Sequence, residues 1–402
     1  MIFDELIDRR NTGAAKWEVA PGPVNLEQCV IPLSVADMEF RSPECIRDVL
    51  TDLAQEGIWG YTIPRPEYYE ALNRWLLARH DFTIEKEWVI PTTGVVQAVY
   101  AAVRAFTEKG DNILIQSPVY YPFYRAIELN ERTLLTNELT IKNGRYEIDF
   151  EDLEQKLSVS KMFILCSPHN PVSRVWDLDD LEKIAEIAAK HDVFVFSDEI
   201  HCDFTFGNKH TVFSLVARKH NARHLVAFSA SKTFSLAGLG VASIIAEDPK
   251  IREIYQQRVN TDGVHTHSTF GFAAAEAAYT RCDDWYFNML DYVYNNFKTL
   301  KSFVAEQMPQ VKLFELEGTY LAWMDFRQLG ADHHSLEQLM IENCLYLDEG
   351  YIFGEGGQGF ERINLACPNK VIIKALGRLK AVYDTLQLRQ HKVENPDLRA
   401  ES

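Results

Sequence analysis

The sequence has 402 residues and a formal net charge of −17, with 47% apolar and 25% charged residues. This acidic excess argues against nucleic acid or an anionic membrane as the main partner, because both bind surfaces rich in lysine and arginine. No apolar run approaches the ~18 residues of a membrane span, and the first ten residues (MIFDELIDRR) lack a signal-peptide pattern. The composition predicts a soluble, cytoplasmic protein long enough for two lobes.

Cysteine and histidine usage gives no sign of a disulfide framework or a metal site. Seven cysteines are scattered between Cys29 and Cys367 without a Cys-x-x-Cys pair. An odd number without regular spacing favours reduced thiols, as in a cytoplasmic protein. The paired histidines, His333-His334 among them, lack the further ligands of a zinc pattern. We therefore expect reduced thiols and no bound metal.

Residues 1–50 are predicted to form an N-terminal segment that prolines interrupt until Ser42-Pro43. Serine at the N-cap and proline at the first helical position are typical of a helix start, so we predict a helix there. The glycines and prolines of 57–66 (GIWGYTIPRP) predict a loop. The spacing of apolar residues from Tyr69 to Leu76 predicts a second, amphipathic helix.

From Trp88 onward, short apolar runs alternate with helical stretches. Such continuous apolar strands predict a mostly parallel sheet with helices on both faces. In sheets of this kind ligands bind at the carboxyl ends of the strands, so the residues that follow each strand are candidates for chemistry. The expected strands are 88–90, 112–115, 161–166, 193–196, 225–228 and 241–246.

A long amphipathic helix from Asp283 to Met308 leads to a second lobe. That lobe has expected strands at 320–325 and 362–365 and a final helix from about Lys370. The sequence thus predicts an α/β fold in four parts. These are an N-terminal segment (1–50) that joins the small domain, a large cofactor-binding domain (51–287), a small α+β domain (288–390) and a polar tail (391–402).

Lys232 follows the apolar strand 225–228, with Ser229 and Ser231 between the strand and the lysine. A buried lysine tends toward the neutral amine, which is nucleophilic and can form a Schiff base with an aldehyde cofactor such as pyridoxal phosphate. The two serines can bind the phosphate of that cofactor. An ordinary strand-end lysine is the alternative, since Ser-x-Ser-Lys is a common sequence.

Polar residues follow two other strands in the same way. Ser197 and then Asp198 follow 193–196, and a buried acid there needs a cationic partner such as a pyridinium nitrogen. Asn170, between two prolines after 161–166, can donate a hydrogen bond to the phenolate of the cofactor. The alternatives are a helix cap or structural ion pair for Asp198 and a turn residue for Asn170.

Three further signals complete the pattern. The helix that begins near Val95 and Val96 offers free amides to a phosphate. Tyr120 follows another strand and can stack on a planar ring, or it is a core tyrosine. Arg362 can hold a carboxylate through two hydrogen bonds, or it forms a surface salt bridge. Together these residues occur in the order that one pyridoxal phosphate site requires.

This order resembles the fold-type I pyridoxal phosphate enzymes of the class I/II aminotransferase superfamily, over the chain to about residue 385. The closer motifs are similar to the cystathionine β-lyase and cystalysin branch of carbon–sulfur β-lyases. The matching segments are Gly94–Val96, Pro118–Tyr120, Asn170-Pro171, Asp198–His201, Ser229–Lys232 and Arg362, and for the branch Ser34–Phe40, Gly60-Tyr61 and Val175-Trp176. The resemblance implies a large domain with a mostly parallel sheet covered by helices, a smaller α+β domain and a homodimer.

The resemblance also implies a role for each residue. Lys232 forms the internal aldimine and moves the substrate Cα proton, Asp198 pairs with the pyridine nitrogen, and Asn170 binds the 3-oxygen. Tyr120 stacks on the ring, and Arg362 binds the substrate α-carboxylate. The phosphate is held by Val95, Val96, Ser229, Ser231 and by Tyr61 of the neighbouring subunit. His201, three residues after the ring aspartate, replaces the tyrosine that is common in aminotransferases.

The predicted function is a carbon–sulfur β-lyase that cleaves cystathionine or related cysteine S-conjugates to pyruvate, ammonia and a thiol, through the Lys232 aldimine and a quinonoid. An aminotransferase is the main alternative, and a non-catalytic pyridoxal phosphate-binding regulatory protein is a second one. The preferred sulfur substrate is open. Ser173 stands where the family usually has glycine, which costs about 1 kcal/mol if the position needs a positive φ.

Overall fold

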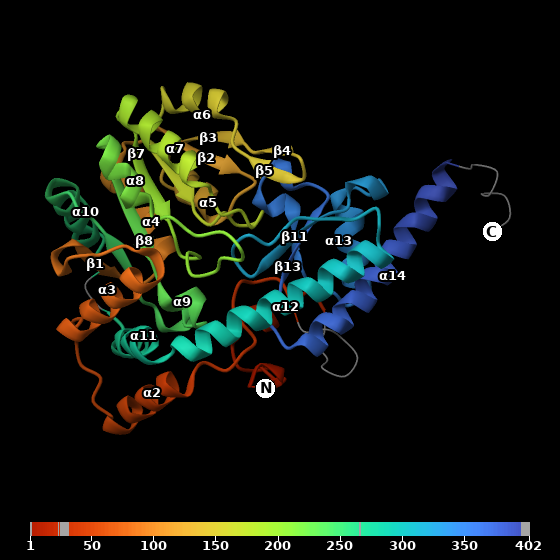
Figure 1. The fold of residues 1–402 in the computed structure, drawn as a ribbon, viewed down its shortest axis with the longest axis horizontal. Helices are drawn as coiled ribbons and strands as arrows, with labels where there is room; N and C mark the ends of the chain where they lie inside the picture. Colours follow the sequence, from red (N-terminus) through yellow and green to blue (C-terminus); the bar gives the residue numbers. More distant parts are fainter. Residues whose placement is uncertain (1, 23, 25–31, 265–266, 395–402) are drawn as a thin grey trace.

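The computed structural model describes residues 2–22, 24, 32–264 and 267–394, and its largest feature is a sheet covered by helices (Figure 1). In this part of the chain the sheet has seven strands in the order β1-β9-β8-β7-β6-β2-β3. Neighbouring strands are parallel except where β9 pairs with β1 and β8. The mostly parallel sheet predicted from the sequence is therefore confirmed. The strands are β1 Val89–Thr92, β2 Asn112–Ser117, β3 Thr133–Glu138, β6 Met162–Cys166, β7 Phe194–Asp198, β8 His224–Phe228 and β9 Ala242–Ile245.

Both faces of this sheet are buried, which explains its continuous apolar strands. Successive side chains of a strand point to opposite faces, so Met162 and Ile164 join one apolar cluster while Phe163 and Leu165 join another. The first cluster is covered by α4 Val95–Phe106, α5 Pro122–Glu128 and α10 Pro249–Thr261. The second is covered by α3 Pro66–His80, α7 Leu178–Lys190, α8 Phe213–His220 and α11 Thr269–Arg281, together with more distant parts of the chain.

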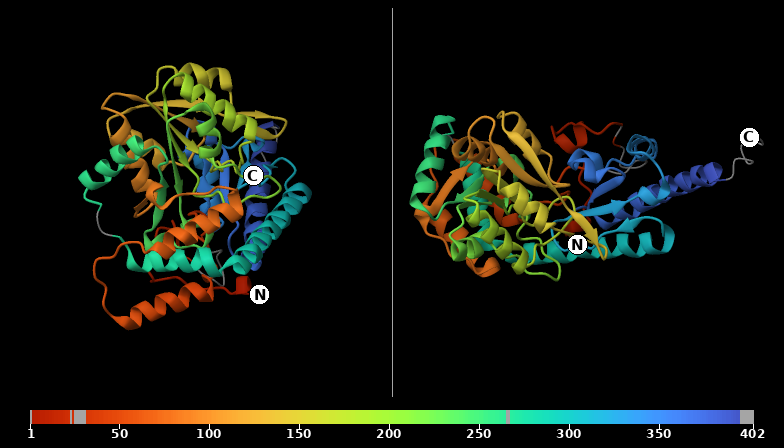
Figure 2. Two further views of the ribbon diagram at one scale, coloured as in Figure 1. Left: turned by 60° about the vertical axis from the view of Figure 1, so that its left-hand side comes forward. Right: turned by 90° about the horizontal axis from the view of Figure 1, so that it is seen from above.

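A smaller antiparallel sheet lies beside the larger one and has the order β10-β11-β13-β12. The long helix α12 (Asp283–Gln307) extends from the larger part of the molecule to this sheet (Figures 1 and 2). The remaining elements of the smaller part are β10 Lys312–Leu313, β11 Leu321–Asp325, β12 Asp348–Glu349, β13 Phe360–Asn364, α13 His333–Glu342 and α14 Asn369–Glu394. The domain limits predicted from the sequence stay a prediction.

Several elements differ from the sequence prediction. The first predicted helix, α2 (Glu44–Glu56), has Pro43 rather than Ser42 at its N-cap. The Ser42 hydroxyl instead lies 3.5 Å from the Phe234 carbonyl. The edge strand β3 and the hairpin of β4 (Thr140–Lys142) and β5 (Arg145–Glu147) were not predicted, because their polar residues lack the apolar runs of the central strands. Pairing with β2 makes β3 a strand.

The N-terminal segment crosses between the two sheets. Asn364 of β13 donates its backbone N–H to the Leu33 carbonyl at 2.9 Å. Its side-chain amide donates to the carbonyls of Val35 and Asp37 at 2.9 and 2.8 Å. The buried Lys16 ammonium lies 2.7 Å from a carboxylate oxygen of Asp37 and anchors the segment from the other side. The backbone of residues 33–37 is thus held in place between the sheets.

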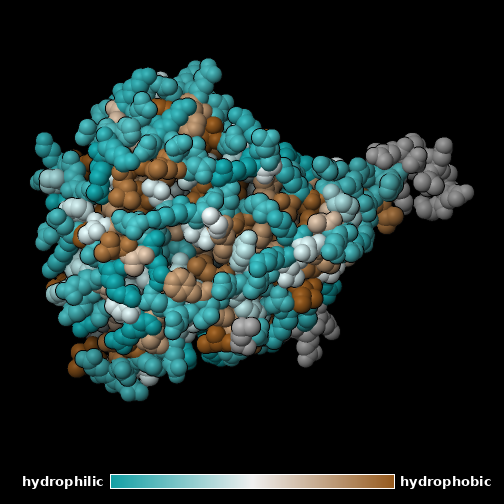
Figure 3. Space-filling view, viewed as in Figure 1, coloured by the Kyte–Doolittle hydropathy of each residue, from teal (hydrophilic) through white to brown (hydrophobic). Residues whose placement is uncertain are grey.

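The surface is mainly hydrophilic on the face that Figure 3 displays, with apolar residues scattered among polar ones. Within the described residues, no helix combines the length and the apolar character that a transmembrane helix requires. The apolar runs found in the sequence are instead the buried strands of the larger sheet.

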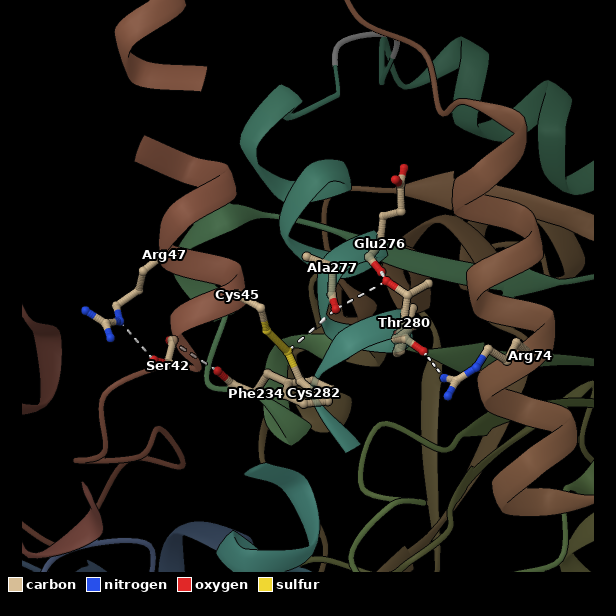
Figure 4. Close-up of a disulfide and its surroundings, with 10 residues drawn as sticks. Ser42, Cys45, Arg47, Arg74, Phe234, Glu276, Ala277, Thr280 and Cys282 are labelled. Atoms are coloured by element: carbon tan, nitrogen blue, oxygen red, sulfur yellow. Dashed lines mark hydrogen bonds between the residues drawn. A yellow bond between two sulfur atoms is a disulfide. The ribbon is translucent and has the colours of Figure 1, made fainter. Parts of the chain in front are cut away.

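A disulfide joins Cys45 of α2 to Cys282, the residue between α11 and α12 (Figure 4). The two cysteines are 237 residues apart in the chain and come together because α2 packs against α11. The expectation of reduced thiols is therefore wrong for this pair. Cys166, Cys202, Cys344 and Cys367 are free thiols, and Cys29 lies outside the described residues.

We expect peptide mapping of alkylated, unreduced protein to recover Cys45 and Cys282 as one linked pair. A Cys45→Ser variant should lose about 2–4 kcal/mol of unfolding free energy in a denaturant titration, because the cross-link restricts the unfolded chain. Cys344→Ser, which changes a partly buried free thiol, is the matched control and should change stability less. Separate alkylation of Cys45 and Cys282 without reductant would contradict the disulfide.

Candidate active site

A cavity of about 250 Å³ lies at the carboxyl edge of the larger sheet. Its wall comes from the segments after β1, β2, β6 and β7, from α9 (Ala230–Thr233) after β8, and from β13 of the smaller sheet. Residues far apart in the sequence meet here because parallel strands end at one edge. The predicted site residues that line the cavity are Val95, Val96, Tyr120, Asn170, Asp198, His201, Ser231, Lys232 and Arg362.

Lys232 extends into the cavity from α9, the short helix after β8. Its Nζ donates a hydrogen bond to the Ala36 carbonyl at 2.7 Å. Burial, together with the charge of Arg362, lowers the pKa of this ammonium from 10.5 to about 8. The neutral amine is therefore reached close to physiological pH, and it is the nucleophilic and basic form of the side chain.

Asp198 ends β7 and is buried at the cavity wall. Burial raises the pKa of its carboxyl from 3.8 to about 7, although the Ile200 N–H, 3.1 Å from Oδ1, and the charge of Lys232 both oppose the shift. A carboxyl with a raised pKa favours a nearby cation, because the cation replaces the lost hydration of the ionised form. Asp198 is thus suited to bind a positively charged group in the cavity.

The first turn of α4 faces the cavity through Val95 and Val96. The first N–H groups of a helix have no acceptor within it, and the helix dipole adds positive charge, so this end suits a phosphate. Ser231 also lines the cavity. Ser229 lies outside the cavity wall, because its Oγ accepts from Ser231 N at 3.0 Å and donates to the Val241 carbonyl at 2.7 Å. Its predicted phosphate contact stays a prediction.

Asn170 and Arg362 connect the two sheets at the cavity. Arg362 Nη1 donates to Asn170 Oδ1 at 2.8 Å, which leaves the Asn170 amide nitrogen available as a donor. Arg362 is 2% exposed, and its Nε is buried without a hydrogen-bond partner among the described residues. A buried N–H without an acceptor is costly, so this guanidinium suits a ligand carboxylate.

Tyr120 and His201 contribute neutral side chains to the wall. Burial raises the pKa of Tyr120 above its usual value. Burial, with the charges of Lys232 and Arg362, lowers the pKa of His201 well below 6.5. Its imidazole is therefore neutral, and within the described part of the chain Nδ1 is buried without a partner. Neither Tyr120 nor His201 therefore contributes a charge to the cavity.

Tyr61 is a second predicted site residue that, like Ser229, does not line this cavity. It lies in the loop between α2 and α3 and is 97% exposed. Ile58, Trp59 and Ile63 of the same loop are also exposed. A short loop with several exposed large apolar side chains is typical of an interaction surface.

A buried hydrogen-bond network centred on Asp203 supports α9, the helix that carries Lys232. Asp203 accepts from Thr233 Oγ1 at 2.6 Å and from Trp75 Nε1 at 3.0 Å, and its Oδ1 lies 2.9 Å from His80 Nε2. His80 and Asp203 belong to a group of side chains close enough together for a metal site. Here the side-chain donors occupy the carboxylate oxygens, so the group acts as a hydrogen-bond network. It anchors Thr233, the neighbour of Lys232.

Ser173 adopts a φ of 61°, a left-handed conformation that costs a non-glycine residue about 1 kcal/mol. Its Oγ donates a hydrogen bond to the Leu321 carbonyl of β11, and its own carbonyl accepts from Gly318 N at 2.8 Å. A hydrogen bond of this kind contributes about 1 kcal/mol, which offsets the backbone cost. The serine thereby ties the loop after β6 to the smaller sheet.

Other cavity residues were not predicted as site residues. Asp348 lines the wall and forms an ion pair with Arg362, its partner across β12 and β13. No sequence signal identified it, because an acidic residue in a polar stretch is ordinary. Val35, Ala36 and Tyr121 complete an apolar part of the wall. For Val35 and Ala36 the resemblance of Ser34–Phe40 to the lyase branch was the available signal.

A family model described as aminotransferase class I and II matches residues 28–379. The chain belongs to this family. It is similar to cystathionine beta-lyase PatB of Bacillus subtilis, with 37% identity over 385 residues, 95% of this chain and 99% of that protein. It is also similar to protein MalY of Escherichia coli, with 30% identity over 94% of this chain and 97% of that protein.

Solved structures of similar proteins confirm the predicted fold. Cystalysin from Treponema denticola, whose crystal structure contains a pyridoxal 5'-phosphate cofactor, has a TM-score of 0.92 and 41% identity over 96% of this chain and 99% of that one. A C-S lyase from Staphylococcus hominis, bound to pyridoxal phosphate and L-cycloserine, has a TM-score of 0.87 and 31% identity over 95% and 98%. The two-sheet architecture is thus that of the fold-type I enzymes.

The cavity residues of this aminotransferase family member fit pyridoxal phosphate group by group. Asp198, whose carboxyl favours a cation, suits the ring nitrogen, and the amide nitrogen of Asn170 suits the phenolic oxygen. The first turn of α4 suits the phosphate. Lys232, with its lowered pKa, suits the aldehyde. The residues of the cavity thus fit the ring nitrogen, the phenolic oxygen, the phosphate and the aldehyde of this cofactor.

The raised pKa of Asp198 predicts a pH-dependent stability of the cofactor-free protein. The folded state keeps this carboxyl proton up to about pH 7, whereas the unfolded chain releases it near its ordinary value of 3.8. The folded state therefore binds more protons in this window, and stability falls as pH rises through it. The side chain of an Asp198→Asn variant does not ionise, so the variant does not lose stability in this way. Its melting temperature should therefore rise relative to wild type between about pH 5 and pH 8. A constant difference across that range would contradict the buried, unpaired carboxyl.

Proposed function

We propose that this protein is a pyridoxal phosphate-dependent carbon–sulfur β-lyase. It cleaves cystathionine or related cysteine S-conjugates to pyruvate, ammonia and a thiol. The observation that carries the proposal is the convergence of Lys232, Asp198, Asn170 and Arg362 on one cavity. The choice of β-elimination is supported by relatives named as cystathionine beta-lyase and C-S lyase at 37% and 31% identity.

Each side chain of the site would have its own role in the reaction. Bound pyridoxal phosphate supplies an electron sink for the substrate's α-carbon. Arg362 holds the α-carboxylate and thereby sets which bond of the α-carbon faces Lys232. The neutral Lys232 amine accepts the α-proton, and its pKa of about 8 lets it act as a base near neutral pH. Loss of a thiolate from the β-carbon then completes the elimination.

Asp198 and Asn170 keep the cofactor in its reactive form. The Asp198 carboxylate pairs with the ring nitrogen and holds that nitrogen protonated. Asn170 is oriented by Arg362, which holds its amide oxygen at 2.8 Å. Substrate binding at Arg362 is thus coupled through one hydrogen bond to the residue that contacts the cofactor.

An aminotransferase is the second candidate, since the same residues can return a proton to the cofactor and release an oxo acid. The family model, whose description is aminotransferase class I and II, favours keeping this candidate. A regulatory pyridoxal phosphate-binding protein is a third candidate. Retention of both Lys232 and Asp198 argues against it, because binding without turnover does not require a base at the α-carbon.

We expect the purified, cofactor-loaded protein to convert L-cystathionine, without an oxo acid, to equal amounts of pyruvate and thiol over many turnovers. Lys232→Ala should lower kcat by about 100-fold or more, because it removes the acid–base group. The control Lys209→Ala changes an exposed lysine that does not line the cavity and should leave kcat unchanged. A single stoichiometric conversion that resumes only with an oxo acid would identify an aminotransferase instead.

The proposed enzyme is a cytoplasmic homodimer in which Tyr61 reaches the partner's phosphate site. The exposure of Tyr61 and of the apolar side chains around it supports this part of the proposal. The Cys45–Cys282 disulfide sits at α2, the helix that precedes this loop. Disulfides are uncommon in reducing compartments, so a cytoplasmic enzyme would meet conditions that can open this bond.

We expect sedimentation to detect a dimer and Tyr61→Phe to weaken cofactor binding, because the variant removes a hydroxyl that contacts the phosphate. A loss of about 1 kcal/mol, or roughly fivefold in Kd, is the scale of one such hydrogen bond. Tyr69→Phe, on the neighbouring helix α3, is the matched control. A fully active monomer would rule out the shared site.

A further inference from the structure

The ion pair between Asp348 and Arg362 occupies the guanidinium that the proposed function assigns to the substrate. Arg362 Nη2 donates to Asp348 Oδ2 and, at 3.2 Å, to the Ser34 carbonyl. Nη1 donates to Asn170 Oδ1. Nε is buried and without a partner among the described residues.

These contacts leave no complete edge of the guanidinium for a second carboxylate. A guanidinium binds a carboxylate bidentately along the Nε/Nη2 edge or along the Nη1/Nη2 edge, and both edges include Nη2. The two hydrogens of Nη2 are already directed to Asp348 and to Ser34. Bidentate binding of a substrate α-carboxylate therefore requires one of these acceptors to move. The Asp348 side chain can rotate, whereas the Ser34 carbonyl belongs to the segment held between the sheets.

Once displaced from Arg362, Asp348 would have no cationic partner in the cavity wall. The ionisable side chains of the wall, apart from the neutral His201 and the tyrosine and cysteine groups, are Lys232, Arg362, Asp198 and Asp348. Once Asp198 pairs with the cofactor and Arg362 with the α-carboxylate, Asp348 has no cation. An anion without a cationic partner at a cavity wall is costly. A positive group on the substrate would remove that cost.

The surroundings of Asp348 supply further carboxyl groups rather than a replacement cation. Its neighbour Glu349 is paired with Glu361 across β12 and β13. Glu361 is 1% exposed, and its Oε2 has no hydrogen-bond partner in the described part of the chain. Burial, together with the charges of Glu349 and Asp348, holds the pKa of Glu361 well above its usual value. Glu349 and Glu361 do not line the cavity, and neither of them gives a displaced Asp348 a cationic partner.

We propose that Asp348 selects substrates whose sulfur substituent carries an ammonium group, as in cystathionine, and disfavours those whose substituent carries a carboxylate but no ammonium group. The proposal rests on the proposed function and specifies its substrate class. In the free enzyme Asp348 occupies the carboxylate position on Arg362. The α-carboxylate of the substrate displaces it, and the released carboxylate binds the ammonium group of the sulfur substituent.

Three cysteine conjugates that differ mainly in the charge of the sulfur substituent test this selection. The test compares kcat/KM for S-(2-aminoethyl)-L-cysteine, S-ethyl-L-cysteine and S-carboxymethyl-L-cysteine, measured by pyruvate release from the cofactor-loaded enzyme. Wild type should prefer the aminoethyl over the ethyl conjugate by about tenfold, the scale of one hydrogen bond between charged groups. The carboxymethyl conjugate should be the poorest substrate.

Asp348→Asn removes the charge and keeps the shape of the side chain. It should reduce the aminoethyl-to-ethyl ratio about tenfold. Arg362 binds the α-carboxylate that all conjugates share, so an effect through Arg362 cancels from this ratio. Glu355→Gln, which removes an exposed carboxylate outside the cavity wall, is the matched control and should leave the ratio unchanged.

Binding of three compounds without a sulfur atom gives a readout that does not depend on elimination. L-lysine, L-norleucine and L-2-aminoadipate match the three conjugates in length, and calorimetry gives their Kd values for the cofactor-loaded protein. Wild type should bind lysine most tightly and aminoadipate least, and Asp348→Asn should bring the lysine and norleucine values together.

The two proposals fail in different ways. If Asp348→Asn changes all three conjugates by one common factor, or if wild type prefers the carboxymethyl conjugate, the selectivity proposal is overturned while the lyase proposal stands. If wild type cleaves none of the conjugates and no cystathionine, the lyase proposal is overturned. The calorimetric order of lysine, norleucine and aminoadipate then decides the selectivity proposal by itself.

Discussion

Burying several ionisable groups around one small cavity places the strongest demand on this fold. Lys232, Asp198 and Arg362 all contribute to the wall of a space of about 250 Å³. Water cannot solvate these charges fully, so the pKa of Lys232 falls to about 8 and that of Asp198 rises to about 7. A fold that buries such groups must hold them rigidly, since their reactivity depends on which neighbours they meet.

Several parts of the fold provide that rigidity. The parallel strands deliver Asp198 and α9 to one edge of the sheet, and the Asp203 network holds Thr233 beside Lys232. The smaller sheet contributes Arg362, and the segment at 33–37 crosses between the sheets with its carbonyls facing the site. Each of these contacts joins segments that are far apart in the chain. The site is therefore a property of the assembled fold rather than of any single motif.

Arg362 has three partners within the protein. It contacts Asn170, Asp348 and the Ser34 carbonyl of the N-terminal segment. A carboxylate that binds to it must compete with these partners. An incoming carboxylate therefore replaces one of these internal acceptors, and its affinity depends on how easily that acceptor is displaced.

The parallel sheet and the polar residues at its strand ends could be predicted from the sequence. Buried strands need apolar runs, and polar residues directly after such runs are conspicuous, so Lys232, Asp198 and Asn170 could be found without coordinates. Polar edge strands such as β3 lacked this signal. Only the folded chain reveals the Cys45–Cys282 bond, the capping role of Ser229 and the pairing of Asp348 with Arg362. These depend on distances between segments far apart in the chain, or on the local rotation of one side chain, and neither leaves a periodic pattern in the sequence.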